Sequence, residues 1–590
     1  MNEEPNDLLK NSGKGSRYFR LWLILMAATF LVLLIGTQFL SGGRRSFSDW
    51  MQPLLFLFAV SLAVATGLLV VWMVGRWVCR WCILKRLLLV GGGVVALIAL
   101  VYAEEYWRGW HTWNQFKHQW EAKGEQFNLA SVLPSPVPED QNFALTPVVF
   151  TSYGQILTRE GKLIPAEQRD EHFAVRMRMP ISLDNQVPTN CAGDRVKGTL
   201  TRLDCWQGYY RDAAARSNAF PVPSQPGSPA ADVVLALSKY DGVIEELRAA
   251  CRLPHSRYPL NYDSESPFMI HLPHLAPLKS CAQGLQLRCL ANLQAGQPEK
   301  ALDDVRLVLQ LTDKVRTEPL LISHLVRIAM VQIMLQPIWE GLAEHKWPDA
   351  QLAALEAELA KLDFLAAWRL SMRGELAAQS DEADYLRRNP ERLEELEALP
   401  KLFGGQNDIR LPSGMAARLI PGGWFYQNRY RCARMLEDYC VPLADEKLGT
   451  FSPNLVRRGE EALAAESASP FSVYERLVLP SLGKAAAGFA YGQASVNLAR
   501  TAIALERYRL AHGAFAESLD ALAPQFISRV PHDVIGGEAL KYRRETSGLF
   551  VLYSIGWNEK DDGGVAAFDK DGALDIQSGD WIWRCAAKAE

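Results

Sequence analysis

The sequence predicts a mainly α-helical protein with three N-terminal transmembrane helices, a helical exported body and a small α+β tail. Two observations predict this class. The first hundred residues are mostly apolar, whereas the rest of the 590-residue chain has an ordinary soluble composition. From about residue 230, apolar residues recur at the 3.6-residue period of a helix. With 63 basic and 66 acidic residues, the chain lacks the positive charge of a nucleic-acid-binding protein, so no nucleic-acid partner is expected.

Three uncharged stretches are the predicted membrane spans, at residues 21–40, 53–75 and 87–103. At 1.5 Å per residue, the first two are long enough to cross ~30 Å of hydrocarbon. The third is shorter, but Arg86 and Glu104 bracket it as interfacial ends. The first stretch is too long for the apolar core of a cleaved signal peptide, so we expect the anchor to be retained.

Basic residues around the spans predict the orientation. Four precede the first span and four lie between the second and third, whereas only Arg44 and Arg45 lie between the first and second. Because loops rich in Lys and Arg stay inside, we expect a cytoplasmic N-terminus and an extracytoplasmic segment at residues 104–590. The predicted location is the bacterial inner (cytoplasmic) membrane.

Composition shifts divide the chain into six predicted parts. These are a cytoplasmic N-terminus at 1–20, the three-helix anchor at 21–103, a juxtamembrane helix with a Pro-rich connector at 104–142, an irregular segment with a few strands at 143–229, a helical domain at 230–480, and a long helix with a small β tail at 481–590. The connector ends the juxtamembrane helix because repeated prolines cannot continue one.

The helical domain contains one predicted helical hairpin, at residues 285–315, with a turn at Gly296. Ala291, Gly296 and Ala301 are spaced as in a tetratricopeptide repeat, whose small residues let paired helices approach closely. No clean 34-residue period continues it, so a nonrepetitive bundle is the alternative. Residues 320–342 are apolar but interrupted by polar side chains, which favours a buried core helix over a fourth span.

The tail is predicted to begin with a long helix at 482–511 that ends at the cap residue Gly513. Residues 539–543 and 549–555 alternate like the strands of a hairpin, and residues 581–583 add a further strand.

Eight of the ten cysteines lie in the predicted exported part, where an oxidising compartment permits disulfides. Cys191 and Cys205 are the candidate local bridge, and the cysteines on predicted helices are expected to be bridged or to be buried thiols. Cys79 and Cys82 have the spacing of a redox or zinc half-site, but no second pair accompanies them.

The acidic segment 557–580 is the predicted metal site. Calcium binds six to eight hard oxygens, which a Gly-punctuated acidic loop can supply. The candidate ligands of a structural calcium ion are Asn558, Asp561, Asp562, Asp569 and Asp571. A solvated turn without metal is the alternative, and no other cofactor is expected.

Other constellations carry weaker signals for chemistry. His271 and His274, with His255, Asp263 and Glu265 upstream, are the candidate transition-metal ligands, although Pro273 separates the first two. A polar loop is the alternative.

A nucleophile or a carboxylate pair would need further partners. Ser481 and Lys484 have the spacing of penicillin-binding enzymes without their companion motifs. Arg373, Glu375 and the acidic residues at 381–384 fit solvated faces or ion pairs, with a hydrolytic carboxylate pair as the alternative. Nucleotide-binding and hydrolase signatures are absent from the sequence.

The order of short motifs in the tail resembles the C-terminal globular part of the type II secretion major pseudopilin. The matching segments are Glu506-Arg-Tyr-Arg-Leu-Ala-His-Gly513, Ser518-Leu-Asp-Ala-Leu522, Val530-Pro-His-Asp533, Leu540-Lys-Tyr542 and Tyr553-Ser-Ile-Gly556. In that family the loop after the Ser-x-Gly strand binds calcium, so the resemblance implies this role for residues 558–562.

Two departures limit this resemblance. Phe515 and Ala516 stand where the family has an aromatic-Pro pair, and the helix before the tail is internal, without a pilin-type N-terminal segment. Pilus assembly is therefore not expected.

The exported architecture also looks like a family of uncharacterised bacterial membrane-anchored proteins. The segments that carry this likeness are Trp120-Glu-Ala-Lys-Gly124, Pro136-Val-Pro-Glu-Asp140 and Gly579-Asp-Trp-Ile-Trp583. It supports the architecture and implies no reaction.

The sequence favours a noncatalytic interaction or scaffold protein of the cell envelope, whose partners are the lipid bilayer and an envelope protein. This rests on helical hairpins able to form grooves and on the absence of catalytic motifs. The alternatives are an envelope hydrolase with a carboxylate or His-based site and a secretion-system accessory protein.

Overall fold

The computed structural model describes residues 19–31, 51–78, 83–151, 156–157, 163–164, 177–183, 187–262, 266–398, 411–465, 469–546 and 548–584. The chain forms two compact units. Unit 1 contains Met1–Gly124, Glu382–Arg434 and Glu461–Ser481; unit 2 contains Glu125–Asp381, Met435–Glu460 and Leu482–Glu590. Unit 1 thus adds two later segments of the chain to the predicted anchor.

The apolar helices of unit 1 are the Phe19–Leu31 helix, α2 (Met51–Val78) and α3 (Ile83–Glu121). Windows of 18 residues in α2 and α3 reach a mean hydropathy of 2.2, so both helices are long and apolar enough to cross a membrane. Trp22 Nε1 donates to Thr66 Oγ1 over 3.3 Å, which joins the first helix to α2. The end of the first predicted span, at 32–40, lies outside the described residues.

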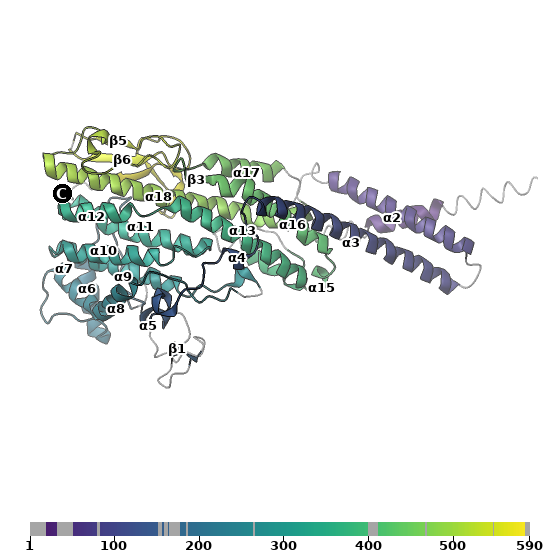
Figure 1. The fold of residues 1–590 in the computed structure, drawn as a ribbon, viewed down its shortest axis with the longest axis horizontal. Coiled ribbons are helices and arrows are strands. Elements are labelled where there is room, and N and C mark those ends of the chain that lie inside the picture. The colour runs from purple at the N-terminus through teal and green to yellow at the C-terminus, as the bar shows by residue number, and fades with distance from the viewer. Residues whose placement is uncertain are drawn as a thin grey trace, which may run out of the picture. The chain divides into compact units, whose positions relative to one another are not determined.

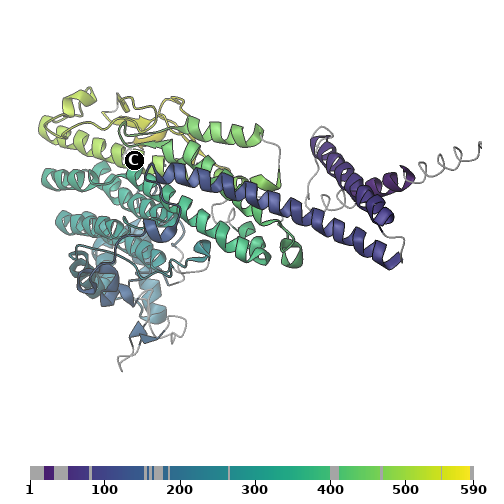
Figure 2. The ribbon, with the colours of Figure 1, turned by 45° about the vertical axis from the view of Figure 1, so that its right-hand side comes forward.

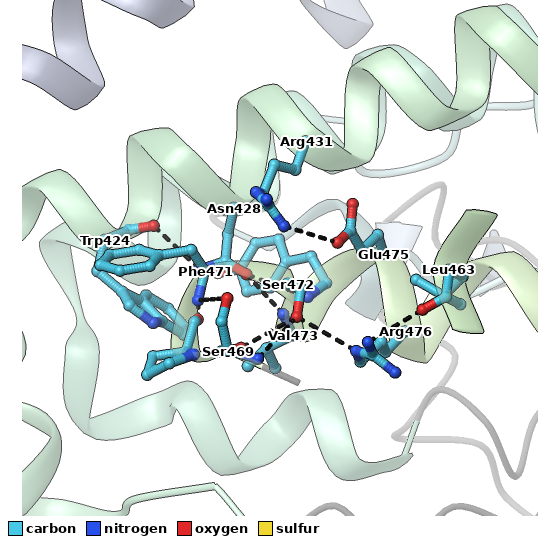
Figure 3. A network of polar contacts seen from close by, with 12 residues as sticks. Trp424, Asn428, Arg431, Leu463, Ser469, Phe471, Ser472, Val473, Glu475 and Arg476 are labelled. Carbon is cyan, nitrogen blue, oxygen red and sulfur yellow. Dashed lines mark hydrogen bonds and ion pairs between the residues drawn. The ribbon is translucent and has the colours of Figure 1, made fainter. Parts of the chain in front are cut away.

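The other elements of unit 1 are α16 (Gly422–Met435), η7 (Pro390–Ala398), α15 (Gly414–Ala417), η10 (Pro470–Ser472), the first turns of α18 (Val473–His512) and the last turns of α13 (Phe364–Arg388) and α17 (Pro453–Ala465). A polar network around Asn428 holds α16 to the start of α18 (Figure 3). We call it the Asn428 network; it contains Trp424, Asn428, Arg431, Leu463, Ser469, Phe471, Ser472, Val473, Glu475 and Arg476.

Unit 2 is built mainly of helices. They are α4 (Leu129–Val132), η2 (Glu139–Gln141), η3 (Phe143–Leu145), α5 (Pro147–Phe150), α6 (Leu203–Ser217), α7 (Pro229–Leu237), η5 (Ser238–Tyr240), α8 (Asp241–Cys251), η6 (Pro267–Met269), α9 (Leu275–Gln294), α10 (Pro298–Asp313), α11 (Leu321–Ala343), α12 (Asp349–Leu359), η8 (Leu436–Cys440), η9 (Val441–Leu443) and η11 (Leu519–Leu522), with most of α13 (Phe364–Arg388) and α18 and part of α17 (Pro453–Ala465). Two short antiparallel pairs accompany them, β1 (Ile156–Leu157) with β2 (Leu163–Ile164) and β3 (Ala444–Asp445) with β4 (Thr450–Phe451).

The centre of the helical body is the predicted hairpin, formed by α9 and α10. Gly296 has a φ of 73°, and Ala291 and Ala301 are fully buried where the two helices meet. Helix α11 packs against α9 (Figure 1). Of its apolar window, 67% is buried inside the protein, which agrees with the predicted core helix.

The tail contains the three strands that the sequence predicts. β5 (Lys541–Arg544), β6 (Phe550–Ser554) and β9 (Trp581–Arg584) form an antiparallel sheet in the order β5-β6-β9. β7 (Ala566–Phe568) and β8 (Leu574–Gly579) form a separate hairpin. The sheet lies beside α18 (Figure 2), where the Tyr491 and Trp581 rings meet at 5.6 Å.

Two elements differ from the sequence prediction. The segment predicted as irregular contains α6, a 15-residue helix that buries Leu203, Trp206 and Tyr210 on one face, so packing of this face outweighs the flanking Gly and Asn signals. Helix α18 begins at Val473 and not at 482, and continues through Pro480, because Leu477, Leu479 and Leu482 bury in the same helix.

Candidate functional site

The predicted disulfide is present: Cys191 and Cys205 are bonded, with 5.5 Å between their Cα atoms. It closes a segment that we call the Arg195 loop, residues 191–205. Of the other cysteines that the structure describes, Cys251, Cys281, Cys289 and Cys440 are buried free thiols, and Cys432 is buried. Cys79, Cys82 and Cys585 lie outside the described residues.

A tight turn shapes the Arg195 loop. The backbone N–H groups of Asp194 and Thr199 each donate to the other's carbonyl oxygen over 2.9 Å. Asp194 Oδ1 also accepts the backbone N–H of Val196 at 2.9 Å, and Gly198 has the left-handed φ of 74° that the turn requires. The turn directs Arg195 away from solvent, leaving it 8% exposed.

The Arg195 guanidinium is held by neutral acceptors from two helices. Its Nη2 group donates to Gln332 Oε1 of α11, to Tyr491 OH of α18 at 2.8 Å and to Ser495 Oγ of α18 at 3.3 Å. The guanidinium also lies 5.8 Å from the ring centres of Tyr491 and Trp583, within the range of cation–π attraction. A buried cation held in this way ties α11, α18 and the tail sheet together.

A buried carboxylate holds the second half of the loop. Glu340, which is 3% exposed, accepts from Thr201 Oγ1 at 2.6 Å, Thr201 N at 3.1 Å and Gln336 Nε2 at 2.8 Å. Burial raises the pKa of Glu340 above its ordinary value, and these hydrogen bonds oppose the shift. A Cβ on Gly193 would lie 2.7 Å from Glu340 Oε1 and 2.8 Å from the backbone nitrogen of Thr201, so the close approach to this backbone favours glycine.

The loop also contacts the tail sheet through an apolar side chain. Val196 packs against Val551, Tyr553 and Ile582. The loop therefore joins three parts of unit 2 that are far apart in sequence: the helical body at α11, the long helix α18 and the C-terminal sheet. Its buried polar groups are engaged with one another, an arrangement suited to fixing the positions of these elements.

Of the three candidate histidines, the structure buries His274 and exposes His255 and His271. His274 Nε2 lies 2.9 Å from Glu318 Oε1, and Ser323 Oγ donates to Glu318 Oε2 at 2.5 Å. The carboxylate thus lies between imidazole and hydroxyl, whereas a catalytic triad places the imidazole in the middle. Asp263 and Glu265 lie outside the described residues.

The predicted calcium ligands lie on two separate turns. After β6, Asp561 Oδ1 accepts from Tyr553 OH and Gly563 N, both at 3.0 Å, and Asp562 Oδ2 accepts from Asn558 Nδ2 at 2.9 Å. Hydrogen bonding, first to Gly563 N and then to Tyr553, lowers the pKa of Asp561.

The second turn joins β7 to β8. Asp569 Oδ1 accepts the backbone N–H groups of Asp571 at 2.9 Å and Ala573 at 2.8 Å. Across the part of the chain that the structure describes, no three His, Cys, Asp or Glu residues are grouped as metal ligands.

Asp580 holds the first of these turns to β9. It is fully buried and accepts from Gly564 N at 2.6 Å and Asp562 N at 3.2 Å. Burial raises its pKa, and the backbone hydrogen bonds oppose the rise.

Two carboxyl groups of the helical body have strongly raised pKa values. Burial raises the pKa of Asp304 to about 7, against the lowering by Arg288 at 2.8 Å and Arg248 at 3.4 Å. Burial also raises the pKa of Glu375 to about 7, and this group accepts the backbone N–H of Leu321 at the start of α11. Both carboxyls therefore hold helices in place.

The remaining candidates make structural contacts as well. Arg373 forms an ion pair with Glu125 at 3.3 Å, and Asp381 accepts the backbone N–H of Leu129 at 2.8 Å. Ser481 and Lys484 both lie on α18, the first buried and the second exposed.

Comparison of this chain with protein-family models, with curated proteins and with solved structures finds no match.

Sequence reasoning found the disulfide and missed what it encloses. Arg195 precedes Gln336 by 141 residues and Thr201 precedes Glu340 by 139, and no sequence motif joins them, so their meeting depends on tertiary packing. The usable signal was the turn sequence Asp194-Arg-Val-Lys-Gly198 inside a Cys-bounded segment.

Proposed function

We propose that this protein is a membrane-anchored interaction or scaffold protein of the bacterial envelope, with residues 104–590 outside the cytoplasm. The observation that carries the proposal is the Arg195 loop. A disulfide and a buried guanidinium join the helical body, α18 and the tail sheet, as a rigid extracytoplasmic platform requires.

The compartment assignment rests on two independent features. Disulfides persist in oxidising compartments and are rare in the cytosol. The distribution of basic residues around the apolar helices points to the same orientation, with the N-terminus in the cytoplasm. A reporter enzyme active only when exported, fused after Glu590, should be active; a signal from a cytoplasm-specific reporter at the same position would contradict the orientation.

The scaffold role predicts a protein partner on the helical body. A photoreactive residue in place of Leu235 of α7, which is 38% exposed, should capture the same envelope protein in repeated experiments on native membranes. The matched control places the residue at Leu510 of α18, which is 45% exposed and lies outside the helical body. A solitary protein at both positions would oppose the scaffold role and favour the hydrolase alternative.

The tail supports a finer proposal, a pseudopilin-like module with a structural calcium ion. A long helix followed by an antiparallel β5-β6-β9 sheet is consistent with that resemblance. If calcium binds, the full-length protein should melt at a higher temperature in calcium than in chelator, because a ligand of the folded state stabilises it. The double change Asp561→Ala with Asp562→Ala should abolish this difference in melting temperature, whereas Asp520→Ala in η11 should leave the difference unchanged. Equal melting temperatures of the wild type in calcium and in chelator would contradict the calcium site.

A further inference from the structure

Unit 1 exposes two large apolar side chains next to its apolar helix α3. On and directly after α15, Met415 is 84% exposed and Leu419 is 70% exposed. Met415 lies on α15 and Leu419 lies in the turn that follows the C-cap residue Arg418, whereas Ala417 between them is buried.

Contacts with α3 fix the level of this segment along the apolar helix. Tyr102 OH donates to the carbonyl oxygen of Leu419 at 2.5 Å. Next along the chain, Gly423 meets α3 so closely that a Cβ there would lie 2.1 Å from the carbonyl oxygen of Glu105. Gln427 Nε2 donates to Glu105 Oε2 at 2.6 Å, and α16 lies beside α3 (Figure 1).

This level coincides with the outer end of the apolar part of α3. Its uncharged stretch runs from Leu87 to Ala103, which at 1.5 Å per residue covers about 26 Å of the ~30 Å of hydrocarbon, and Glu104 follows as the interfacial end. Exposed Trp107 and Trp110 follow, as in the aromatic belt of a membrane interface. Leu419, held at Tyr102, therefore lies at the depth of the outer acyl-chain and headgroup boundary.

The charges around the segment agree with this depth. Arg418, between the two apolar residues, forms a 3.4 Å ion pair with Glu391, and its side chain is 66% exposed. On α3, Arg108 forms ion pairs with Glu104 and Glu105. An apolar face with flanking charged side chains is the pattern of a segment that lies in the plane of the interface.

We propose that residues 414–420 form a second membrane contact, in which Met415 and Leu419 insert into the outer leaflet beside α3. The ligand is the phospholipid surface itself. The contact would fix α15 and the start of α16 at the bilayer, in addition to the spanning helices.

The test measures the depth of labels in the full-length protein, reconstituted in vesicles of phosphatidylethanolamine and phosphatidylglycerol. Met415→Cys and Leu419→Cys are labelled with an environment-sensitive fluorophore. Leu448→Cys, 67% exposed on the turn between β3 and β4, is the matched control, and the labelled wild type gives the background of native thiols. Lipids with a nitroxide near the headgroup or at the chain end act as quenchers.

Labels at 415 and 419 should show blue-shifted emission and lose more intensity to the shallow quencher than to the deep one, whereas the 448 label should lose none to either. Quenching at 415 no stronger than at 448 would overturn the proposal. A blue shift that appears only at high protein-to-lipid ratio would overturn it in favour of contact with a second copy.

Discussion

Two polar assemblies of this protein hold helices together by different means. In unit 2 the Arg195 loop inserts a cation among neutral acceptors of α11 and α18, and a disulfide closes the loop. In unit 1 the Asn428 network holds α16 to α18 through a neutral amide: Asn428 Nδ2 donates to the carbonyl oxygens of Trp424 at 3.0 Å and Pro470 at 2.9 Å (Figure 3).

The same amide completes a helix start. Asn428 Oδ1 accepts the backbone N–H groups of Val473 at 2.9 Å and Tyr474 at 3.2 Å. These groups lie in the first turn of α18, where the helix itself supplies no acceptor. Ser469 and Ser472 add a reciprocal capping box. In the Asn428 network, one neutral side chain satisfies backbone donors at the start of a helix. In the Arg195 loop, a buried charge and a disulfide hold the assembly together.

The largest expected loss of stability comes from a substitution that disrupts the unit 2 assembly and leaves the unit 1 assembly intact. Arg195→Ala should lower the free energy of unfolding by about 4 kcal/mol, because it empties a packed site and leaves the acceptors Gln332 and Tyr491 without their donor. Hydrogen exchange should rise in peptides of α11 and β9 and not in those of α16. Lys197→Ala, at an exposed position of the same loop, is the control; equal losses for the two variants would contradict the role given to Arg195.

Opening the disulfide should have the next largest effect. Cys191→Ser with Cys205→Ser should cost about 3 kcal/mol, the value expected for a loop of this length. Reductant should shift the denaturation midpoint of the wild type and leave that of the double variant unchanged. A reductant effect on both proteins would place the redox sensitivity elsewhere.

The unit 1 assembly should be weakened less by its central change. Asn428→Ala should cost about 2 kcal/mol, since the site loses a buried cap and two donors to carbonyl groups. Ser469→Ala, which removes one cap bond, should cost about 1 kcal/mol. Local exchange at the start of α18 measures both, and the comparison fails if Ser469→Ala is the more damaging change.

The smallest expected effect is the pH-dependent change in stability caused by Glu375, which caps the start of α11 as a carboxyl group. The pKa of Glu375 is raised to about 7 from an ordinary 4.5, so the folded chain binds the proton more tightly than the unfolded chain. Wild-type stability should therefore fall as pH rises through this interval, and Glu375→Gln should gain about 1 kcal/mol over the wild type above pH 7 and little near pH 4.5.

Chemical denaturation at the two pH values measures this difference. Glu299→Gln, on the exposed surface of α10, controls for the loss of one negative charge. A stability difference for Glu375→Gln that is the same at both pH values would show that its carboxyl is not strained by burial.

Much of the fold follows from local pattern. The α9–α10 hairpin with its Gly296 turn, the burial of α11 and the β5-β6-β9 strands agree with predictions from periodicity and turn residues. Helix α6 was not predicted, because the glycine and asparagine residues around it locally favour irregular structure. The helix is stabilised by burial of the face that carries Trp206 and Tyr210, and this burial depends on tertiary packing.

By itself, the sequence determined the apolar helices and the helical period, because each depends on neighbours within a few turns of the chain. It indicated Cys191–Cys205 as the candidate local bridge, and the structure shows that bond. Only the tertiary structure decided that Arg195 reaches Tyr491, that Glu375 accepts the backbone N–H of Leu321 at the start of α11, and that Asn428 caps α18. The physical reason is desolvation: a buried polar group has to find a partner wherever packing supplies one, and that partner carries no mark in the local sequence.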